Sequence, residues 1–295
     1  MQPPLSMILF TVLAGAGQGL MVALAALEAA AAMGLGATLG LTRLLGGAVV
    51  LALAGAGLAA ATLHLGHPLR AWRAVAMWRT SWLSREVIVL PAFMACVALW
   101  VLTGALPWAL AAAALALVLY LCTGMIYAAV KAMREWAHPV TPLNFGLLGL
   151  ASGFTLAAVL VPGRSAGLAA AALAATLLGA ASRGWALWRN LNLSPKTTLQ
   201  TAIGIRHPRI VQISQGAMGG TFNTREFFHR RDAGFVRGMR ALAAVAGFGL
   251  PALLLAMGAA LPLALASQLL GLLAERWCFF AEARHPQNLY HQGVA

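Results

Sequence analysis

Eight long runs of apolar side chains divide this 295-residue sequence and leave little freedom in its fold. A helix needs roughly 20 predominantly apolar residues to cross a hydrocarbon core about 30 Å thick. Lipid offers no partners to backbone N–H and C=O groups, so each run is predicted to be helical. The expected spans are approximately Leu5–Ala26, Leu39–Leu63, Val87–Thr103, Pro107–Val130, Pro142–Pro162, Ala166–Leu187, Met239–Leu261 and Pro262–Ala281. The predicted fold class is therefore all-α, a polytopic membrane protein with an eight-helix transmembrane bundle.

The composition supports this fold class. Hydrophobic residues make up 61% of the chain and charged residues 9%, with a mean hydropathy of +0.82, which excludes an ordinary soluble domain. We interpret residues 1–295 as a single transmembrane domain with a long basic loop at about 189–237. The first run lacks the charged start and small-residue cleavage site of a signal peptide, so it is predicted to be a retained helix.

The basic residues are distributed very unevenly across the predicted membrane. An even number of spans places both termini on one side, and 18 of the 20 lysines and arginines fall on that same side. The opposite side keeps only Arg43 and Arg164. The positive-inside rule predicts that the crowded side, with both termini, is cytoplasmic. A basic surface that docks an acidic partner produces the same distribution, so this alternative stays open. Nucleic acid is not an expected partner.

The positions of the cysteines and histidines limit which redox cofactors the chain could hold. Cys96, Cys122 and Cys278 lie singly in three different apolar runs, so no iron–sulfur or other metal site is predicted, and we interpret them as small apolar packing residues. A b-type haem needs paired histidines at membrane depth. Only His64 and His138 could approach a haem, and neither has a partner at that depth. We therefore expect no haem.

The stretch between the second and third runs carries the most informative chemistry. It reads His64-Leu-Gly-His67-Pro68, then Arg70-Ala-Trp72-Arg73, and closes on Trp82-Leu-Ser84-Arg85-Glu86. Pro68 ends helical geometry and puts His64 at the hydrocarbon boundary. Ser84 is predicted to cap the third helix, with Glu86 in its first turn. If the loop folds back, as its tryptophans suggest, His64 and Glu86 face a common cleft.

A histidine and a carboxylate that share a cleft suit quinone chemistry. An imidazole with a pKa near 6.5 can exchange a proton with a phenolic oxygen, and a half-buried carboxylate can relay that proton to water. His67, Arg70, Trp82, Arg85 and Tyr127 are the further candidate quinone contacts. Structural alternatives remain open for all of them. Glu86 can offset the positive end of a helix, worth about 0.3–1 kcal/mol, arginines can face lipid phosphates, tryptophans can anchor at the interface, and Tyr127 can serve packing.

Two adjacent opposite charges lie within the last apolar run. Intramembrane charge is a functional candidate by default. Near a helix end, however, such neighbours are more often a structural pair or a snorkelling arginine. We therefore interpret Glu275 and Arg276 as a structural pair or as a carboxylate beside a snorkelling arginine, with a quinone contact as the alternative.

These motifs resemble those of the dimethyl sulfoxide reductase membrane anchor subunit family. The resemblance rests on residues 62–73, on Ser81 to Glu86, and on the closing run from Glu275 to His285. It implies an eight-helix anchor in the bacterial inner membrane that holds two partners, a ferredoxin-like subunit with four iron–sulfur clusters and a molybdopterin catalytic subunit. It also implies binding of a quinone or quinol, either menaquinone or ubiquinone, at the boundary with these partners. The family's quinol-linked histidine and glutamate fall on His64 and Glu86.

The long basic loop resembles one branch of this family more than the other. Its segments 205–209 and 219–228 are similar to the related membrane anchor of cytoplasmic sulfite dehydrogenases. This branch implies a sulfite-oxidising, quinone-reducing complex whose substrate chemistry lies on another chain. The alternative is a quinol-oxidising dimethyl sulfoxide reductase anchor. A secondary transporter is more distant, because transporters usually show related halves and polar groups at mid-bilayer.

Overall fold

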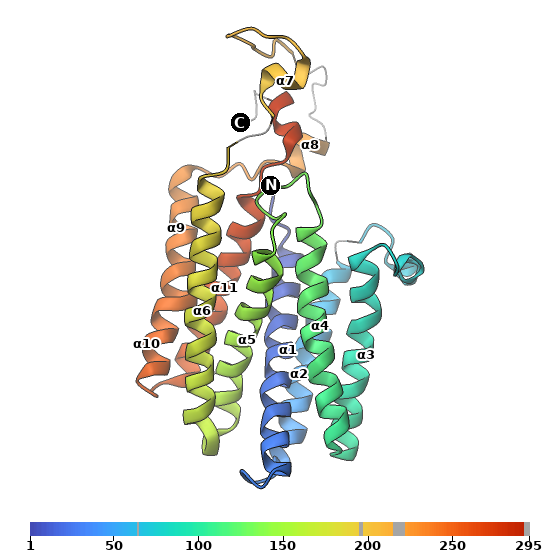
Figure 1. The fold of residues 1–295 in the computed structure, drawn as a ribbon, viewed down its shortest axis with the longest axis vertical. Coiled ribbons are helices and arrows are strands. Elements are labelled where there is room, and N and C mark those ends of the chain that lie inside the picture. Colours follow the sequence, from blue (N-terminus) through green and yellow to red (C-terminus); the bar gives the residue numbers. More distant parts are fainter. Residues whose placement is uncertain (64, 195–196, 215–221, 292–295) are drawn as a thin grey trace.

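The computed structural model describes residues 1–63, 65–194, 197–214 and 222–291, and all the regular structure within them is helical. Among the described residues, eight helical segments are long and apolar enough to cross a membrane, which confirms the predicted number of spans and the all-α class. They are α1 (Leu5–Ala32), α2 (Leu41–Thr62), α3 (Trp82–Thr103), α4 (Leu106–Ala128), α5 (Val140–Leu160), η2 with α6 (Pro162–Arg164 and Ser165–Leu191), α9 to α10 (Ala233–Ala256) and α11 (Leu261–Ala281) (Figure 1).

The seventh span is built from three pieces, and shorter helices occupy the connections. Its pieces are α9 (Ala233–Ala244), one π-helical turn η3 (Val245–Gly249) and α10 (Leu250–Ala256). The connections contain η1 (Pro68–Met77), α7 (Leu199–Ile203), α8 (Phe222–Glu226) and the C-terminal η4 (Pro286–Tyr290). These four helices, together with Met1, lie at one end of the bundle, the upper end in Figure 1, which we call the basic end.

Several helix bounds differ from the sequence-based expectation, and the seventh span runs from Ala233 to Ala256 rather than from Met239 to Leu261. α3 begins at Trp82 rather than Val87, because Ser81 and not Ser84 is its N-cap: the backbone N–H of Ser84 donates to Ser81 Oγ at 3.3 Å. The predicted Ser84 cap is therefore wrong, and Glu86 lies in the second turn instead of the first. α1 continues to Ala32, since the alanines that follow Glu28 keep a strong helix propensity.

Small residues bring the central helices into close contact. α1 packs against α2, α4, α5 and α11, and it is the most buried of the spans. Gly19 of α1 and Gly153 of α5 meet backbone to backbone. The Tyr120 hydroxyl of α4 donates to the carbonyl of Gly15 at 2.7 Å. Interhelical packing of this kind depends on residues without bulky side chains.

We expect Gly153→Ala to lower the free energy of unfolding by about 1–3 kcal/mol, because the added Cβ collides with the backbone of Gly19, which cannot rotate away. Thermal unfolding of the purified protein measures this loss. Gly167→Ala in α6 is the matched control, since no heavy atom lies within 4 Å of a Cβ there. Equal unfolding temperatures for the two variants would contradict the proposed contact.

Candidate functional site at the basic end

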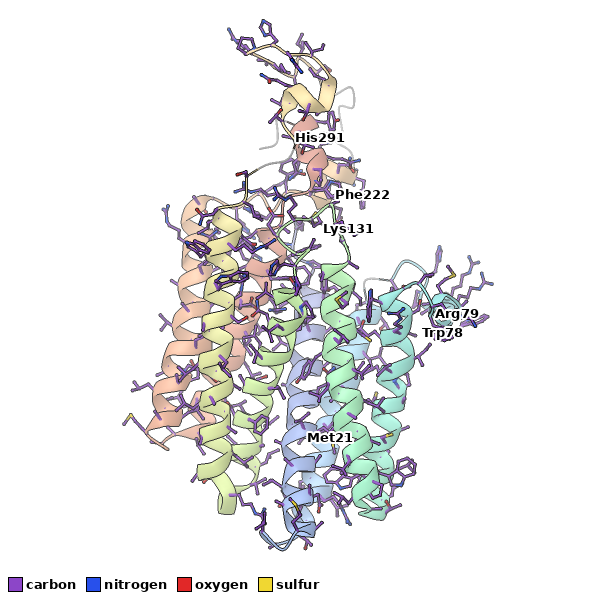
Figure 2. All side chains as sticks on the ribbon, in the orientation of Figure 1. Met21, Trp78, Arg79, Lys131, Phe222 and His291 are labelled. Carbon is purple, nitrogen blue, oxygen red and sulfur yellow. The ribbon has the colours of Figure 1, made fainter. Side chains whose placement is uncertain are left out.

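The connection between α2 and α3 carries the first motif that the sequence singles out. His64 lies outside the described residues. Pro68 opens η1, and both His67 and Arg70 are exposed beside it. η1 packs against α3, but Trp78 and Arg79 point away from the bundle (Figure 2). The described part of the connection is thus a surface segment at the side of α3.

Arg85 links this connection to the start of α3 through hydrogen bonds. Its Nε donates to the carbonyl of Trp78 at 3.0 Å and its Nη2 to the carbonyl of Arg79 at 2.8 Å. Its guanidinium also lies over the Trp82 ring, 4.2 Å from the centroid, in a cation–π contact. Arg85 therefore holds the end of the connection in place directly before Glu86 enters the bundle.

Glu86 is a buried carboxylate near the basic end of α3. The residue as a whole is 5% exposed. Its Oε1 accepts a hydrogen bond from Thr123 Oγ1 of α4. Among the described residues, the ion pairs of the spans involve Glu275 and Glu282, and none involves Glu86. A buried carboxyl group with a hydroxyl as its neighbour can take up or release a proton toward a bound molecule.

Tyr127 lies one helical turn beyond Thr123 on the same face of α4. Its ring contacts Trp136, Phe145, Phe279 and Phe280, with centroids 5.3 to 5.5 Å away. Such edge and stacked contacts stabilise a packed cluster, so the ring makes the packing contacts considered for it. The hydroxyl is nevertheless buried and has no hydrogen-bond partner among the described residues. That leaves it available to a ligand or a water molecule.

The structure brings some of the candidate residues together and separates others. Glu86 and Tyr127 are buried inside the bundle, where Glu86 accepts a hydrogen bond from Thr123, one helical turn before Tyr127 on α4. Trp82 and Arg85 lie at the edge of the bundle. His67 and Arg70 lie outside it. Thr123 was not predicted from the sequence, because it contacts a residue on another helix that is 37 positions away. An isolated threonine in an apolar run also forms no recognisable pattern.

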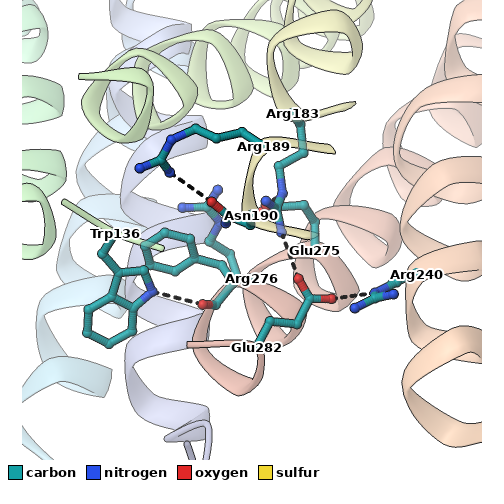
Figure 3. Close-up of polar contacts among 9 residues, drawn as sticks. Trp136, Arg183, Arg189, Asn190, Arg240, Glu275, Arg276 and Glu282 are labelled. Atoms are coloured by element: carbon teal, nitrogen blue, oxygen red, sulfur yellow. Dashed lines mark hydrogen bonds and ion pairs between the residues drawn. The ribbon is translucent and has the colours of Figure 1, made fainter. Parts of the chain in front are cut away.

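A second buried polar cluster joins α6, α9 and α11 near the basic end. Glu275 pairs with Arg276 and with Arg183, each at 2.5 Å, which confirms the interpretation of Glu275 and Arg276 as a structural pair. Glu282 extends the cluster to Arg240 at 2.6 Å and lies 3.8 Å from Arg183 (Figure 3). The sequence offered one indication of these further partners: charges near the same ends of three apolar runs.

The long connection between α6 and α9 is tied to the C-terminal tail. The Asn223 side chain donates to Gln287 Oε1 at 3.0 Å. The Asn288 side chain donates to the carbonyl of Phe227 at 3.2 Å. The Tyr290 hydroxyl donates to the carbonyl of Ala202 at 3.1 Å. These bonds connect α7 and α8 to the C-terminal η4, and the three helices protrude above the bundle as a segment that we call the cap (Figure 1). The described part of the connection is thus folded against the tail.

Comparison with known proteins gives two matches. A family model for the DMSO reductase anchor subunit (DmsC) matches residues 1–195, a range that includes both motif stretches around η1 and all of α1 to α6. The C subunit of the sulfite dehydrogenase of Allochromatium vinosum is 46% identical over 325 aligned residues, and the alignment covers all of both chains. The similarity to this protein thus extends through the long connection, α9, α10 and α11.

Proposed function

Because this chain belongs to the DMSO reductase anchor subunit (DmsC) family, as its motifs predict, we propose that it couples partner oxidoreductase subunits to the quinone pool. The membrane anchor role comes with the family. The proposal adds that a quinone or quinol binds at the basic end of α3 and α4 and exchanges electrons there with an iron–sulfur subunit. The observation that carries it is the buried Glu86, paired with Thr123 directly beneath the motif-bearing connection.

The residues around Glu86 supply what quinone conversion demands of a protein. Reduction of a quinone takes up protons together with electrons, so a proton-exchanging group must lie beside the quinone oxygen. Glu86 fills this role, with the hydroxyl of Tyr127 one turn beyond Thr123 on α4 as a hydrogen-bond donor. We assign His64 to a second proton-exchanging position at the same boundary. The aromatic face of Trp82 and the guanidinium of Arg85 border the site at its outer edge.

His67 and Arg70 take a different part in this proposal. Both are exposed in the connection, so we assign them to the entrance of the site, where they meet quinone headgroups and lipid phosphates before entry. The bound molecule is a menaquinone or a ubiquinone. A positive segment at a membrane surface attracts anionic headgroups, and each basic residue near the surface contributes about 1 kcal/mol.

The cap above the bundle is the proposed docking surface for the partner subunits. A hollow of about 490 Å³ opens at its base, lined among others by Lys131, Arg134, Glu135, Arg284 and His285. Three of these five side chains are arginine or lysine, which suits an acidic face on a partner. The partners are a ferredoxin-like subunit with four iron–sulfur clusters and a molybdopterin catalytic subunit.

The name of the relative from Allochromatium vinosum, a sulfite dehydrogenase, favours sulfite as the electron source. Sulfite oxidation and quinone reduction balance in electrons, so this chain would act as the quinone-reducing end of the complex. We expect the intact assembly to reduce a ubiquinone or menaquinone analogue when sulfite is supplied, and to show no quinol oxidation with dimethyl sulfoxide. The opposite result would assign this chain to a quinol-oxidising reductase. A chain that purifies without partner subunits and works alone would exclude the anchor proposal.

The orientation in the membrane can be tested separately. We expect a reporter enzyme that is active only in the periplasm to remain silent when fused after Ala295, because the positive-inside rule places the basic end in the cytoplasm. The same reporter inserted between α5 and α6, after Gly163, should be active, since this connection lies at the other end of the bundle. Inverted results for the two fusions would place the basic end, and the partner subunits with it, outside the cytoplasm.

A further inference from the structure

A cavity of about 380 Å³ lies between α6 and the seventh span, with α11 as its floor. Its volume falls within the range typical of small-molecule sites. It has no part in the Glu86 site, because its lining comes from the other half of the bundle. Its walls are mostly apolar, among them Leu177, Ala180, Phe248 and Ala252. Charged side chains close only its basic end.

The π-helical turn shapes one wall of this cavity. Gly247 of η3 packs against Gly271 of α11, and the Ser267 hydroxyl donates to the carbonyl of Ala246 at 2.9 Å. These contacts hold the turn on α11, while the next two residues, Phe248 and Gly249, face the cavity. π-turns within helices occur frequently at functional sites.

The charged end of the cavity carries an excess of positive charge. Arg183, Arg240, Glu275 and Glu282 line it, and Arg276 joins the same cluster from behind. Three arginines thus face two carboxylates. Arg240 is partly exposed, and its bond to Glu282 uses only one of the five N–H groups of a guanidinium. Donors and one positive charge remain to receive an anion.

The position of the cavity in the span indicates which anion fits. Trp185 and Trp188 of α6 are exposed at the level of the arginines, where tryptophans mark the boundary between headgroups and hydrocarbon. From this level the lining of α6 runs from Leu187 down to Thr176, about 17 Å at the rise of a helix. A ligand must therefore carry its anionic group at headgroup level and an apolar chain that extends toward mid-bilayer.

We propose that this cavity binds one anionic phospholipid, with its phosphate on Arg183 and Arg240 and one acyl chain along Leu177, Ala180, Phe248 and Ala252. The lipid fills the space between α6 and the seventh span and supplies the missing negative charge. Basic pockets between transmembrane helices bind anionic headgroups by the same chemistry.

Native mass spectrometry of the intact assembly, stripped of lipid in detergent, tests the proposal. Phosphatidylglycerol and phosphatidylcholine with identical acyl chains are added back separately. We expect the wild type to retain one phosphatidylglycerol and to bind phosphatidylcholine about tenfold more weakly, since only the former carries a net negative charge. Equal retention of both lipids would overturn the assignment of the arginines as a phosphate site. Displacement of phosphatidylglycerol by a ubiquinone analogue would overturn the lipid as occupant.

Two variants and one control locate the site. Gly184 lines the cavity, and a Cβ placed there meets no heavy atom within 4 Å, so Gly184→Leu adds an apolar side chain to the cavity wall without displacing the backbone. Retention of phosphatidylglycerol should fall about tenfold in Gly184→Leu and in Arg240→Gln. Gly238→Leu, at an equally open glycine of α9 outside the lining, should retain the lipid as the wild type does. Quinone turnover should stay normal in all three. Full retention in both cavity variants would overturn the proposal.

Discussion

Glu86→Gln is expected to lower the rate of electron exchange between the assembly and a quinone analogue by roughly 100-fold, the usual contribution of a positioned proton-exchanging group. Glutamine has nearly the same shape and still accepts the hydrogen bond from Thr123. It cannot take up or release a proton. The variant therefore separates the chemistry of the carboxyl group from its packing. Activity of the partner subunits with a soluble dye should stay unchanged, because this route avoids the anchor.

Steady-state kinetics with both electron acceptors, on the same preparation, measures this effect. Glu28→Gln is the matched control: this residue lies in α1 toward the opposite end of the bundle, and we expect wild-type quinone turnover. His64→Ala should resemble Glu86→Gln if the two residues serve one quinone. Normal quinone turnover in both variants would exclude these two residues as the site and would leave only the anchor role of the family.

Glu275→Leu is expected to lower the free energy of unfolding by about 3–5 kcal/mol, the typical cost of breaking a buried ion pair from one side. Glu275 and Arg276 are 1% and 4% exposed, and Arg183 also approaches the same carboxylate. Removal of the carboxylate leaves the positive charges of Arg183 and Arg276 with less negative charge beside them in a medium of low dielectric constant. Thermal unfolding of the purified protein and its steady-state amount in the membrane both report the loss.

The double variant Glu275→Leu/Arg276→Leu identifies the cause. Replacement of a whole buried ion pair by apolar residues is often nearly neutral, and Arg183 keeps Glu282 as a neighbour. We therefore expect the double variant to recover most of the stability. Glu226→Leu, at an exposed site on α8, should unfold like the wild type. If the double variant loses as much stability as the single one, shape rather than unpaired charge accounts for the effect.

The transmembrane part of the fold follows directly from hydrophobicity. Apolar runs of sufficient length leave no alternative to helices in lipid, so all eight spans could be predicted. Helix ends are harder, because Ser81 and Ser84 both have the chemistry of an N-cap and only packing selects Ser81. The π-turn at Val245–Gly249 has no distinct pattern in sequence. Within it Gly247 packs against Gly271 of α11, a contact between residues far apart in sequence.

The candidate sites were predictable only in part for a related reason. Glu86 is visible in sequence because a carboxylate at the edge of an apolar run is unusual. Its partner Thr123 and the partners of Glu275 are not visible, since contacts between helices depend on rotation and depth that no linear pattern records. Resemblance to a family pointed to His64 and Glu86, whereas the cavity beside Arg240 was found only from the three-dimensional arrangement.

Ionisable side chains occupy the described spans very unevenly. α5 has no Asp, Glu, Lys, Arg or His, and α6 before Arg183 and α11 before Glu275 have none either. α3 after Glu86 and α4 likewise have none, so we expect no proton path through these spans toward the end opposite Glu86. If quinone reacts at Glu86, protons enter and leave on the face where electrons arrive, and the reaction is not electrogenic. Turnover in sealed vesicles should then be the same with and without an imposed voltage.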